Sequence, residues 1–132
     1  MTGVIDVSGI IEILLQKEKI HTYRKVLEDS SIILAPDLYI SELTNTLWKY
    51  YALKKLAKDE CIQCIQDGIN YVDKFINSEE IWEEAFSEGI KNSHSVYDMF
   101  YLVTARRNNG TLITNDSILA GICRKNHVQV CH

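Results

Sequence analysis

The sequence contains a single proline, Pro36, and only six glycines in 132 residues. It therefore lacks the proline- or glycine-rich stretches that mark flexible linkers between domains. Long apolar runs are missing as well. The longest stretch without Asp, Glu, Lys or Arg is eight residues, Asn108 to Asn115, whereas a membrane helix needs about 20 apolar residues. These absences predict one domain, residues 1–132, with no membrane-spanning segment.

Signals for export are also missing. No basic residue precedes the first apolar stretch, and Asp6 and Glu12 interrupt it, which is unlike a secretory signal. A chain of this size buries enough apolar surface to fold without covalent staples. We therefore expect a cytoplasmic protein whose four cysteines are reduced thiols.

The cysteines offer half of a zinc site at most. Cys61 and Cys64 form a C-x-x-C pair, which is one half of a common zinc motif. The other two, Cys123 and Cys131, have seven residues between them, and the C-x-x-C pair falls inside a helical pattern. This arrangement favours ordinary thiols over zinc ligands, and it assigns the four cysteines no role.

Charge is unevenly distributed along the chain. The 14 Lys and Arg against 18 Asp and Glu give a net charge of −4, which as an average argues against a nucleic-acid partner. Residues 59–90 hold nine of the acids and one base, so the rest of the chain is positive. That remainder could bind a phosphate backbone if some of its acids bind metal, although both parts are also compatible with ordinary solvated surfaces.

Apolar periodicity predicts alternating strands and helices. Strands are expected at Val4–Ile5, Ile32–Leu34, Thr111–Thr114 and Val128–Val130. Helices are expected from Ile10 to Leu15 and at about Leu38–Ala57, Asp59–Phe75, Glu79–Lys91, Val96–Asn108 and Ser117–Lys125. This alternation predicts an α/β fold, with a parallel sheet covered by helices on both faces.

Details of two helices follow from the same periodicity. Pro36 is expected at the start of the second helix, whose buried face would carry Ile40, Leu43, Leu47 and Tyr51 and whose polar face would carry Glu42, Asn45, Thr46 and Lys49. Three aromatic residues at helical spacing are expected to pack in the core: Tyr97, Phe100 and Tyr101. The four histidines are scattered, and none is expected to act as a catalytic base.

Four acidic residues lie near the ends of predicted strands or in early turns of predicted helices: Asp6, Glu42, Asp98 and Asp116. Asp6 ends the first strand and Asp116 follows a later one, so parallel strands would place both at one edge of the sheet. Glu42 and Asp98 could converge on them. Carboxylates repel one another unless a cation neutralises them, and an all-oxygen ligand set suits Mg²⁺ or Mn²⁺.

Each of these acids also has a purely structural interpretation. Ser95 and Asp98 have the spacing of a capping box. Asp116 could cap the helix that follows it, and Glu42 could lie on a solvated helix face. Asp6 is harder to explain in this way unless it caps the next helix, because its neighbours are apolar.

Four segments of the chain resemble the PIN-domain family. They are VIDVSGIIEILL, APDLYISELTNTLWK, SVYDMFYLVTARRNNGTLITNDSIL and the closing VQV, in the family's order and at similar spacing. The motifs are an Asp at the end of the first strand, E-x-x-N early in a long helix, Y-D-x-x-Y-L-x-x-A, and T-x-D-x-x-L after a strand. The pattern is most similar to the small VapC-type toxins of bacterial and archaeal toxin–antitoxin pairs.

The resemblance implies a three-layer α/β/α fold with a central parallel sheet of about four or five short strands. It also implies an endoribonuclease that uses one or two Mg²⁺ or Mn²⁺ ions. The implied catalytic residues are Asp6, Glu42, Asp98 and Asp116, of which Asp6, Asp98 and Asp116 would hold metal, with Ser8, Asn45 and Thr114 as substrate-binding or supporting polar neighbours. The implied partners are an RNA substrate, a small antitoxin protein and a second copy of the chain.

Other functions fit some of these features. A nuclease of RNA processing without an antitoxin, or a non-catalytic PIN-like scaffold that binds RNA or protein, would carry a similar sequence. A phosphoacceptor domain of the flavodoxin-like class also gathers acids at strand ends, but it needs paired acids after the first strand. Here Val7 and Ser8 follow Asp6, which disfavours that class.

Overall fold

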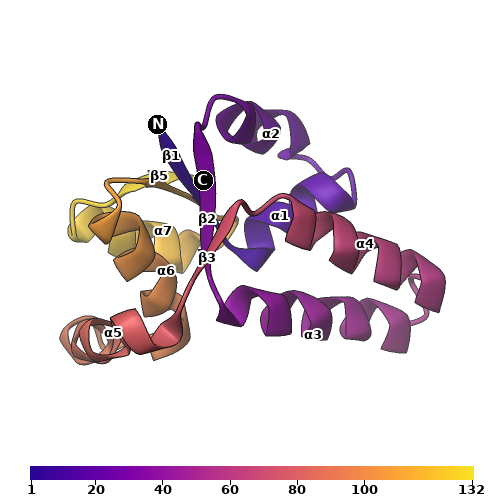
Figure 1. Cartoon of the computed structure of the whole chain (residues 1–132). Coiled ribbons are helices and arrows are strands. Elements are labelled where there is room, and N and C mark those ends of the chain that lie inside the picture. The colour runs from indigo at the N-terminus through magenta and orange to yellow at the C-terminus, as the bar shows by residue number, and fades with distance from the viewer.

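The computed structural model describes residues 1–132 and places a five-stranded sheet between two layers of helices (Figure 1). The strands are β1 (Thr2–Ile5), β2 (Ile32–Pro36), β3 (Lys74–Ile76), β4 (Thr111–Ile113) and β5 (Gln129–Cys131). All neighbouring strands are parallel, in the order β3-β2-β1-β4-β5. The predicted three-layer α/β/α fold with its parallel sheet is confirmed.

Seven helices cover the sheet. They are α1 (Val7–Leu14), α2 (Ile20–Glu28), α3 (Leu38–Ala52), α4 (Lys58–Asn70), α5 (Ser78–Asn92), α6 (Val96–Arg107) and α7 (Ser117–Lys125). Helices α1 to α4 lie on one side of the sheet and α5 to α7 on the other (Figure 1). None of the seven combines the length and apolar character that a membrane crossing requires.

The direction of the chain across the sheet reverses beside β1. From β1 the chain moves to β2 and β3 on one side, and it then returns to β4 and β5 on the other. Parallel connections of this kind are almost always right-handed, so the two directions place their helices on opposite faces. The point of reversal lies between β1 and β4, where open α/β sheets form their ligand crevice.

The two central strands are buried on both faces. Val4 and Ile5 of β1 and Leu112 and Ile113 of β4 have no exposed surface. Burial on both faces requires consecutive apolar residues rather than alternation, and this is why these two strands could be predicted from short apolar runs.

Two elements were not predicted. Helix α2 follows the first helix directly, and strand β3 lies where the sequence predicted a helix continuing to Phe75. β3 has three residues at the sheet edge, of which only Ile76 is buried, so its apolar signal is short.

The predicted position of Pro36 was wrong. Pro36 ends β2 instead of starting a helix, a position that proline tolerates because it needs no further ladder hydrogen bond.

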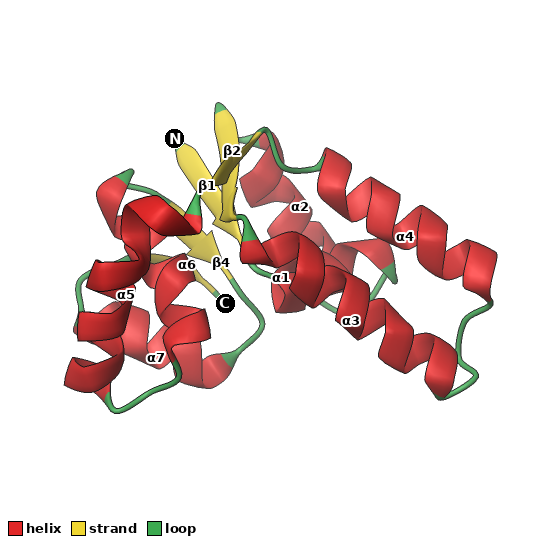
Figure 2. Cartoon of the chain, turned by 60° about the horizontal axis from the view of Figure 1, so that its bottom comes forward, coloured by secondary structure: helices red, strands yellow, loops and turns green.

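Helices α3 and α4 form an antiparallel pair that projects from the body of the molecule (Figures 1 and 2). Helix α3 ends at Ala52 rather than Ala57, and Lys54 then adopts a left-handed conformation with φ of 57°. Leu43 and Leu47 are buried as predicted, but Ile40 and Tyr51 are 38% and 53% exposed. The pair is only two helices thick, so one side of α3 has no partner to cover it.

Gly9 sets how closely α1 approaches β4. A Cβ atom at this position would lie 2.8 Å from the carbonyl oxygen of Ile113 and 2.9 Å from a methyl group of Ile5. We expect Gly9→Ala to lower the free energy of unfolding by about 1–2 kcal/mol, because overpacking against backbone outweighs the better helix propensity of alanine. Urea denaturation would measure the change.

Gly121 provides the matched control for this substitution. It lies in α7, and a Cβ atom there would meet nothing within 4 Å. Gly121→Ala should therefore leave stability unchanged or raise it by up to about 1 kcal/mol through helix propensity alone. Equal effects of the two substitutions would show that α1 can move away from β4 at no cost.

Candidate active site

Asp6 lies directly after β1 and begins α1. Its Oδ1 accepts hydrogen bonds from the backbone N–H of Gly9 at 2.8 Å and from the Ser8 hydroxyl at 2.7 Å, and its Oδ2 accepts one from the Thr114 hydroxyl. The side chain therefore caps α1. Burial raises the pKa of Asp6 to about 7, although all three hydrogen bonds lower it, and the charge of Asp98 raises it further.

Ser8 and Thr114 connect Asp6 to the loop that follows β4. The Ser8 Oγ accepts the backbone N–H of Asn115 at 2.8 Å, and the Thr114 Oγ1 accepts that of Asp116 at 3.0 Å. Both hydroxyl protons point to the Asp6 carboxylate, so both oxygens are free to accept from the loop. The two side chains thereby fix the position of Asp116 relative to Asp6.

Asp116 begins α7 in the same way that Asp6 begins α1. Its Oδ1 accepts the backbone N–H groups of Ile118 at 2.9 Å and Leu119 at 3.1 Å. The capping interpretation is correct for both residues. It does not exclude a role in binding, because capping uses one oxygen of Asp116 and its Oδ2 accepts no hydrogen bond from the protein.

Glu42 projects from α3 and bonds to the opposite helical layer. The Tyr101 hydroxyl of α6 donates to Glu42 Oε1 at 2.7 Å. Burial raises the pKa of Glu42, with a smaller contribution from the charge of Asp98, whereas the Tyr101 hydrogen bond lowers it. Burial and the nearby Glu42 carboxylate raise the pKa of Tyr101 well above its ordinary value, so Tyr101 remains a hydrogen-bond donor.

Asp98 lies in the first turn of α6 and pairs with a histidine. Its Oδ2 is 2.7 Å from His94 Nε2, one helical turn earlier in the chain. Ser95 begins the helix without a side-chain hydrogen bond. The expected capping box between Ser95 and Asp98 is therefore absent, and the Oδ1 of Asp98 has no hydrogen-bond partner in the protein.

All four predicted acids line one pocket of about 370 Å³ at the carboxyl ends of β1 and β4. Ser8 lines it as well, while Thr114 is buried beneath it with no exposed surface. Asn45 does not line the pocket and is exposed; its neighbour Thr46 lines the pocket instead. The structure thus brings together the four acids and Ser8, with Thr114 below them, and leaves Asn45 outside.

The chemistry of this donor set fits Mg²⁺ or Mn²⁺, which take oxygen ligands and keep several waters. Glu42, Asp98 and Asp116 each have one oxygen without a hydrogen bond. As placed, however, no three Asp, Glu, His or Cys side chains converge on a single ion position. His94, Tyr101 and the α7 backbone each bond to one of these carboxylates.

Sequence reasoning did not assign several residues of the pocket region, among them Glu12, His94, Tyr101 and Lys17. His94 had a usable signal, because it precedes Asp98 by four residues and this spacing aligns side chains on a helix. Tyr101 was expected in the core and is buried, but its bond to Glu42 spans 59 positions and has no sequence signal. Lys17, which lines the pocket, follows the first helix in an unpredicted turn. Tyr97, also expected in the core, is 64% exposed.

The cysteines take no part in the pocket. All four are free thiols; Cys61 and Cys123 are buried, and Cys64 and Cys131 are partly buried. Burial raises the pKa of Cys123 to about 12 and raises the pKa of Cys64 and of Cys131 as well. Cys64, Cys123 and Cys131 are therefore protonated near neutral pH and are poor nucleophiles.

Comparison with known proteins adds three findings. The family model for the PIN domain matches residues 3–125. Ribonuclease VapC3 of Pyrobaculum aerophilum is 26% identical over 122 residues, which cover 91% of this chain and 93% of that protein. The crystal structure of PAE2754 from Pyrobaculum aerophilum matches with a TM-score of 0.74 over 92% of this chain and 87% of that one, at 18% identity. This last match shows a common fold.

Proposed function

Because the chain belongs to the PIN-domain family, we propose that it is a metal-dependent endoribonuclease and the toxin of a type II toxin–antitoxin pair. The observation that carries this proposal is the pocket lined by Asp6, Glu42, Asp98 and Asp116, which come from four separate segments of the chain. The similarity to Ribonuclease VapC3 supports RNA as the substrate.

We propose that Asp6, Asp98 and Asp116 hold the metal and that Glu42 orients the attacking water. Mg²⁺ or Mn²⁺, when bound, activates water and neutralises charge on the phosphate. Tyr101 holds Oε1 of Glu42, so the other oxygen, Oε2, is available to accept a proton. A pKa raised by burial makes Glu42 a better proton acceptor than an exposed glutamate.

The supporting residues fix the geometry of this site. Ser8 and Thr114 hold the Asp6 carboxylate and the backbone N–H groups of Asn115 and Asp116 in one hydrogen-bond network.

Attack by water leaves a 5′-phosphate and a 3′-hydroxyl, whereas attack by the RNA's own 2′-hydroxyl would leave a cyclic phosphate. The ends of the products therefore report whether the carboxylate pocket performs the reaction.

The direct test uses purified protein and end-labelled single-stranded RNA in Mg²⁺, Mn²⁺ or EDTA. We expect cleavage to 5′-phosphate ends in either metal and none in EDTA, together with a rise in melting temperature when Mn²⁺ is added, because an ion that binds only the folded state stabilises it. An intact RNA in both metals and an unchanged melting temperature would contradict the proposal and favour a non-catalytic scaffold.

Partners and location are proposed with the function. We propose a single domain over residues 1–132, a cytoplasmic location, a homodimer and a small antitoxin as partner. A short reading frame beside the gene that encodes a small DNA-binding protein, and the inhibition of RNA cleavage by that protein, would support the toxin. Cleavage without such a partner would favour a nuclease of RNA processing.

A further inference from the structure

A pocket lined by five carboxylates, the four predicted acids and Glu12, repels the phosphates of RNA, so the protein needs cations beside it to hold the strand. Lys17 is the one basic residue among those that line the pocket. It is exposed, and it forms no ion pair with any carboxylate of the protein. Its ammonium group is therefore available to an anion from outside.

The position of Lys17 is fixed at both ends. Its backbone N–H donates to the carbonyl of Glu12 at 2.8 Å, in a turn where Gln16 has a φ of 51°. Its Nζ donates to the hydroxyl of Tyr50 at 2.8 Å and lies 5.5 Å from the centre of the Tyr50 ring. The turn after α1 is thereby attached to α3, with the charge held at the rim of the pocket.

A second ammonium group faces the same aromatic ring. Lys55 Nζ lies 5.8 Å from the ring centre of Tyr50, and Lys55 also has no carboxylate partner. Lysines near the end of a helix favour its dipole and need no further explanation. Lys17 likewise follows the C-terminus of α1, but the dipole does not explain why it comes from a different element and converges on the same ring.

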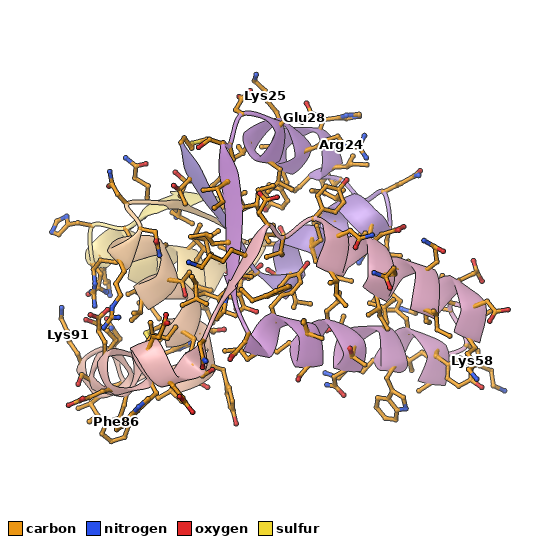
Figure 3. The ribbon with its side chains drawn as sticks, viewed as in Figure 1. Arg24, Lys25, Glu28, Lys58, Phe86 and Lys91 are labelled. Carbon is orange, nitrogen blue, oxygen red and sulfur yellow. The ribbon has the colours of Figure 1, made fainter.

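Helix α3 joins these lysines to the carboxylates in one row. Glu42 and Thr46 line the pocket, and Tyr50 follows at the same four-residue spacing, about one helical turn or 5.4 Å further along. The row therefore runs along α3, from the pocket toward the outer end of the α3–α4 pair. Lys58 lies at that outer end (Figure 3). A strand that follows the row would pass Tyr50 and its two lysines first.

The two arginines in the last turn of α6 are already paired with carboxylates. Arg106 of α6 pairs with Glu84 at 3.2 Å and Glu88 at 2.9 Å, and Arg107 pairs with Glu84 at 3.4 Å. These arginines cannot receive a phosphate without giving up a carboxylate. The unpaired positive charge in the pocket lining itself is that of Lys17, which bonds to α3.

We propose that Lys17, Tyr50 and Lys55 form a binding site for the backbone of single-stranded RNA next to the scissile bond. The two ammonium groups bind neighbouring phosphates. Tyr50 sets the distance between the ammonium groups and offers a ring face to a base or sugar. This inference rests on the proposed nuclease function, whose pocket it extends. It also sets the path of the substrate, along α3 and away from α5 and α6.

Binding without cleavage tests the site. A fluorescein-labelled, unstructured RNA of about ten nucleotides, which is enough to span a single-strand binding groove, is titrated with protein in EDTA and followed by fluorescence anisotropy. We expect Lys17→Gln and Lys55→Gln each to weaken binding by about five- to tenfold and to reduce the slope of log K against log salt by about 0.7. Both side chains are exposed, so circular dichroism and melting should match those of the unmodified protein.

Lys25→Gln is the matched control. Lys25 projects from α2, well away from the α3–α4 pair (Figure 3), and it pairs with Asp29 at 3.3 Å. Its loss should change RNA affinity by less than about twofold, as for an exposed charge that touches no phosphate. If the Lys17 and Lys55 variants bind like the Lys25 variant, with the full salt slope, the proposed site is overturned.

The same measurements separate this inference from the nuclease proposal. RNA binding that depends on both lysines, in a protein that cleaves nothing in Mg²⁺ or Mn²⁺, would support the lysine site and refute the nuclease. RNA cleavage by a protein whose RNA affinity does not depend on either lysine would support the nuclease and refute the lysine site.

Discussion

Asp98→Asn is expected to lower the rate of Mn²⁺-dependent RNA cleavage by about 10³-fold or more, which corresponds to at least about 4 kcal/mol in the activation barrier. Asp98 is near enough to both Asp6 and Glu42 for its charge to raise their pKa values. The amide keeps the hydrogen bond to His94 but removes the negative charge that would hold a cation. The fold should be unaffected, because the Asp98 side chain is 29% exposed and bonds only to His94.

The rate is measured in single turnover with end-labelled RNA, beside Asp29→Asn. Asp29 ends α2 and carries an exposed carboxylate outside the pocket, so that variant should cleave at the original rate. The increase in melting temperature with Mn²⁺ should also disappear in Asp98→Asn and persist in Asp29→Asn. A cleavage rate within tenfold of the original would remove Asp98 from the proposed metal site.

Asp6→Asn should stabilise the metal-free protein at alkaline pH while abolishing cleavage. The pKa of Asp6 is about 7 in the folded protein against an ordinary value of 3.8, and burial is the largest cause. Below about pH 4 the carboxyl group is protonated in both states and costs nothing. Between pH 4 and 7 the unfolded chain loses the proton that the folded chain keeps, so stability falls as pH rises, by at most about 4 kcal/mol above pH 7.

The asparagine variant has no such penalty. Its side chain retains the acceptor for Gly9 and Ser8, and its amide can donate to Thr114, whose hydroxyl can turn to Ser8 at 3.1 Å. We expect its melting temperature in EDTA to exceed that of the unmodified protein by about 5–10 °C at pH 8 and by little at pH 4. Added Mn²⁺ should reduce this difference in melting temperature, since only the unmodified protein is expected to bind the ion. A variant that melts lower at pH 8 would show that the carboxylate is stabilising even without metal.

The fold could be predicted from the sequence where the local sequence signal of an element matches the burial of that element in the structure. Ser117–Lys125 was predicted at its observed bounds from its apolar periodicity, and Asp116 caps it as the sequence allowed. The paired central strands were predicted because both faces are buried. Strand β3 was not, because an edge strand of three residues depends on its neighbour: Asp73 Oδ2 accepts the N–H of Ile33 at 2.8 Å, 40 positions away.

The residues of the candidate site also fall into two groups, those with a local sequence signal and those placed by tertiary packing. The acids could be named because each follows a strand or lies in an early turn of a helix, and the topology then brings those positions to one pocket. The groups that hold them are set by tertiary packing: Tyr101 reaches Glu42 from the opposite layer, and Lys17 reaches Tyr50 across 33 positions. Asn45 was named from its motif spacing, but the structure leaves it exposed outside the pocket.

The central position of β1 has a consequence during synthesis of the chain. β1 pairs with β4, and Asp6 receives its hydrogen bond from Thr114, 108 positions later. A growing polypeptide therefore carries Asp6 long before the residues that complete its surroundings have left the ribosome. The four carboxylates stay apart until then, and the assembled pocket forms only after residue 116 has emerged.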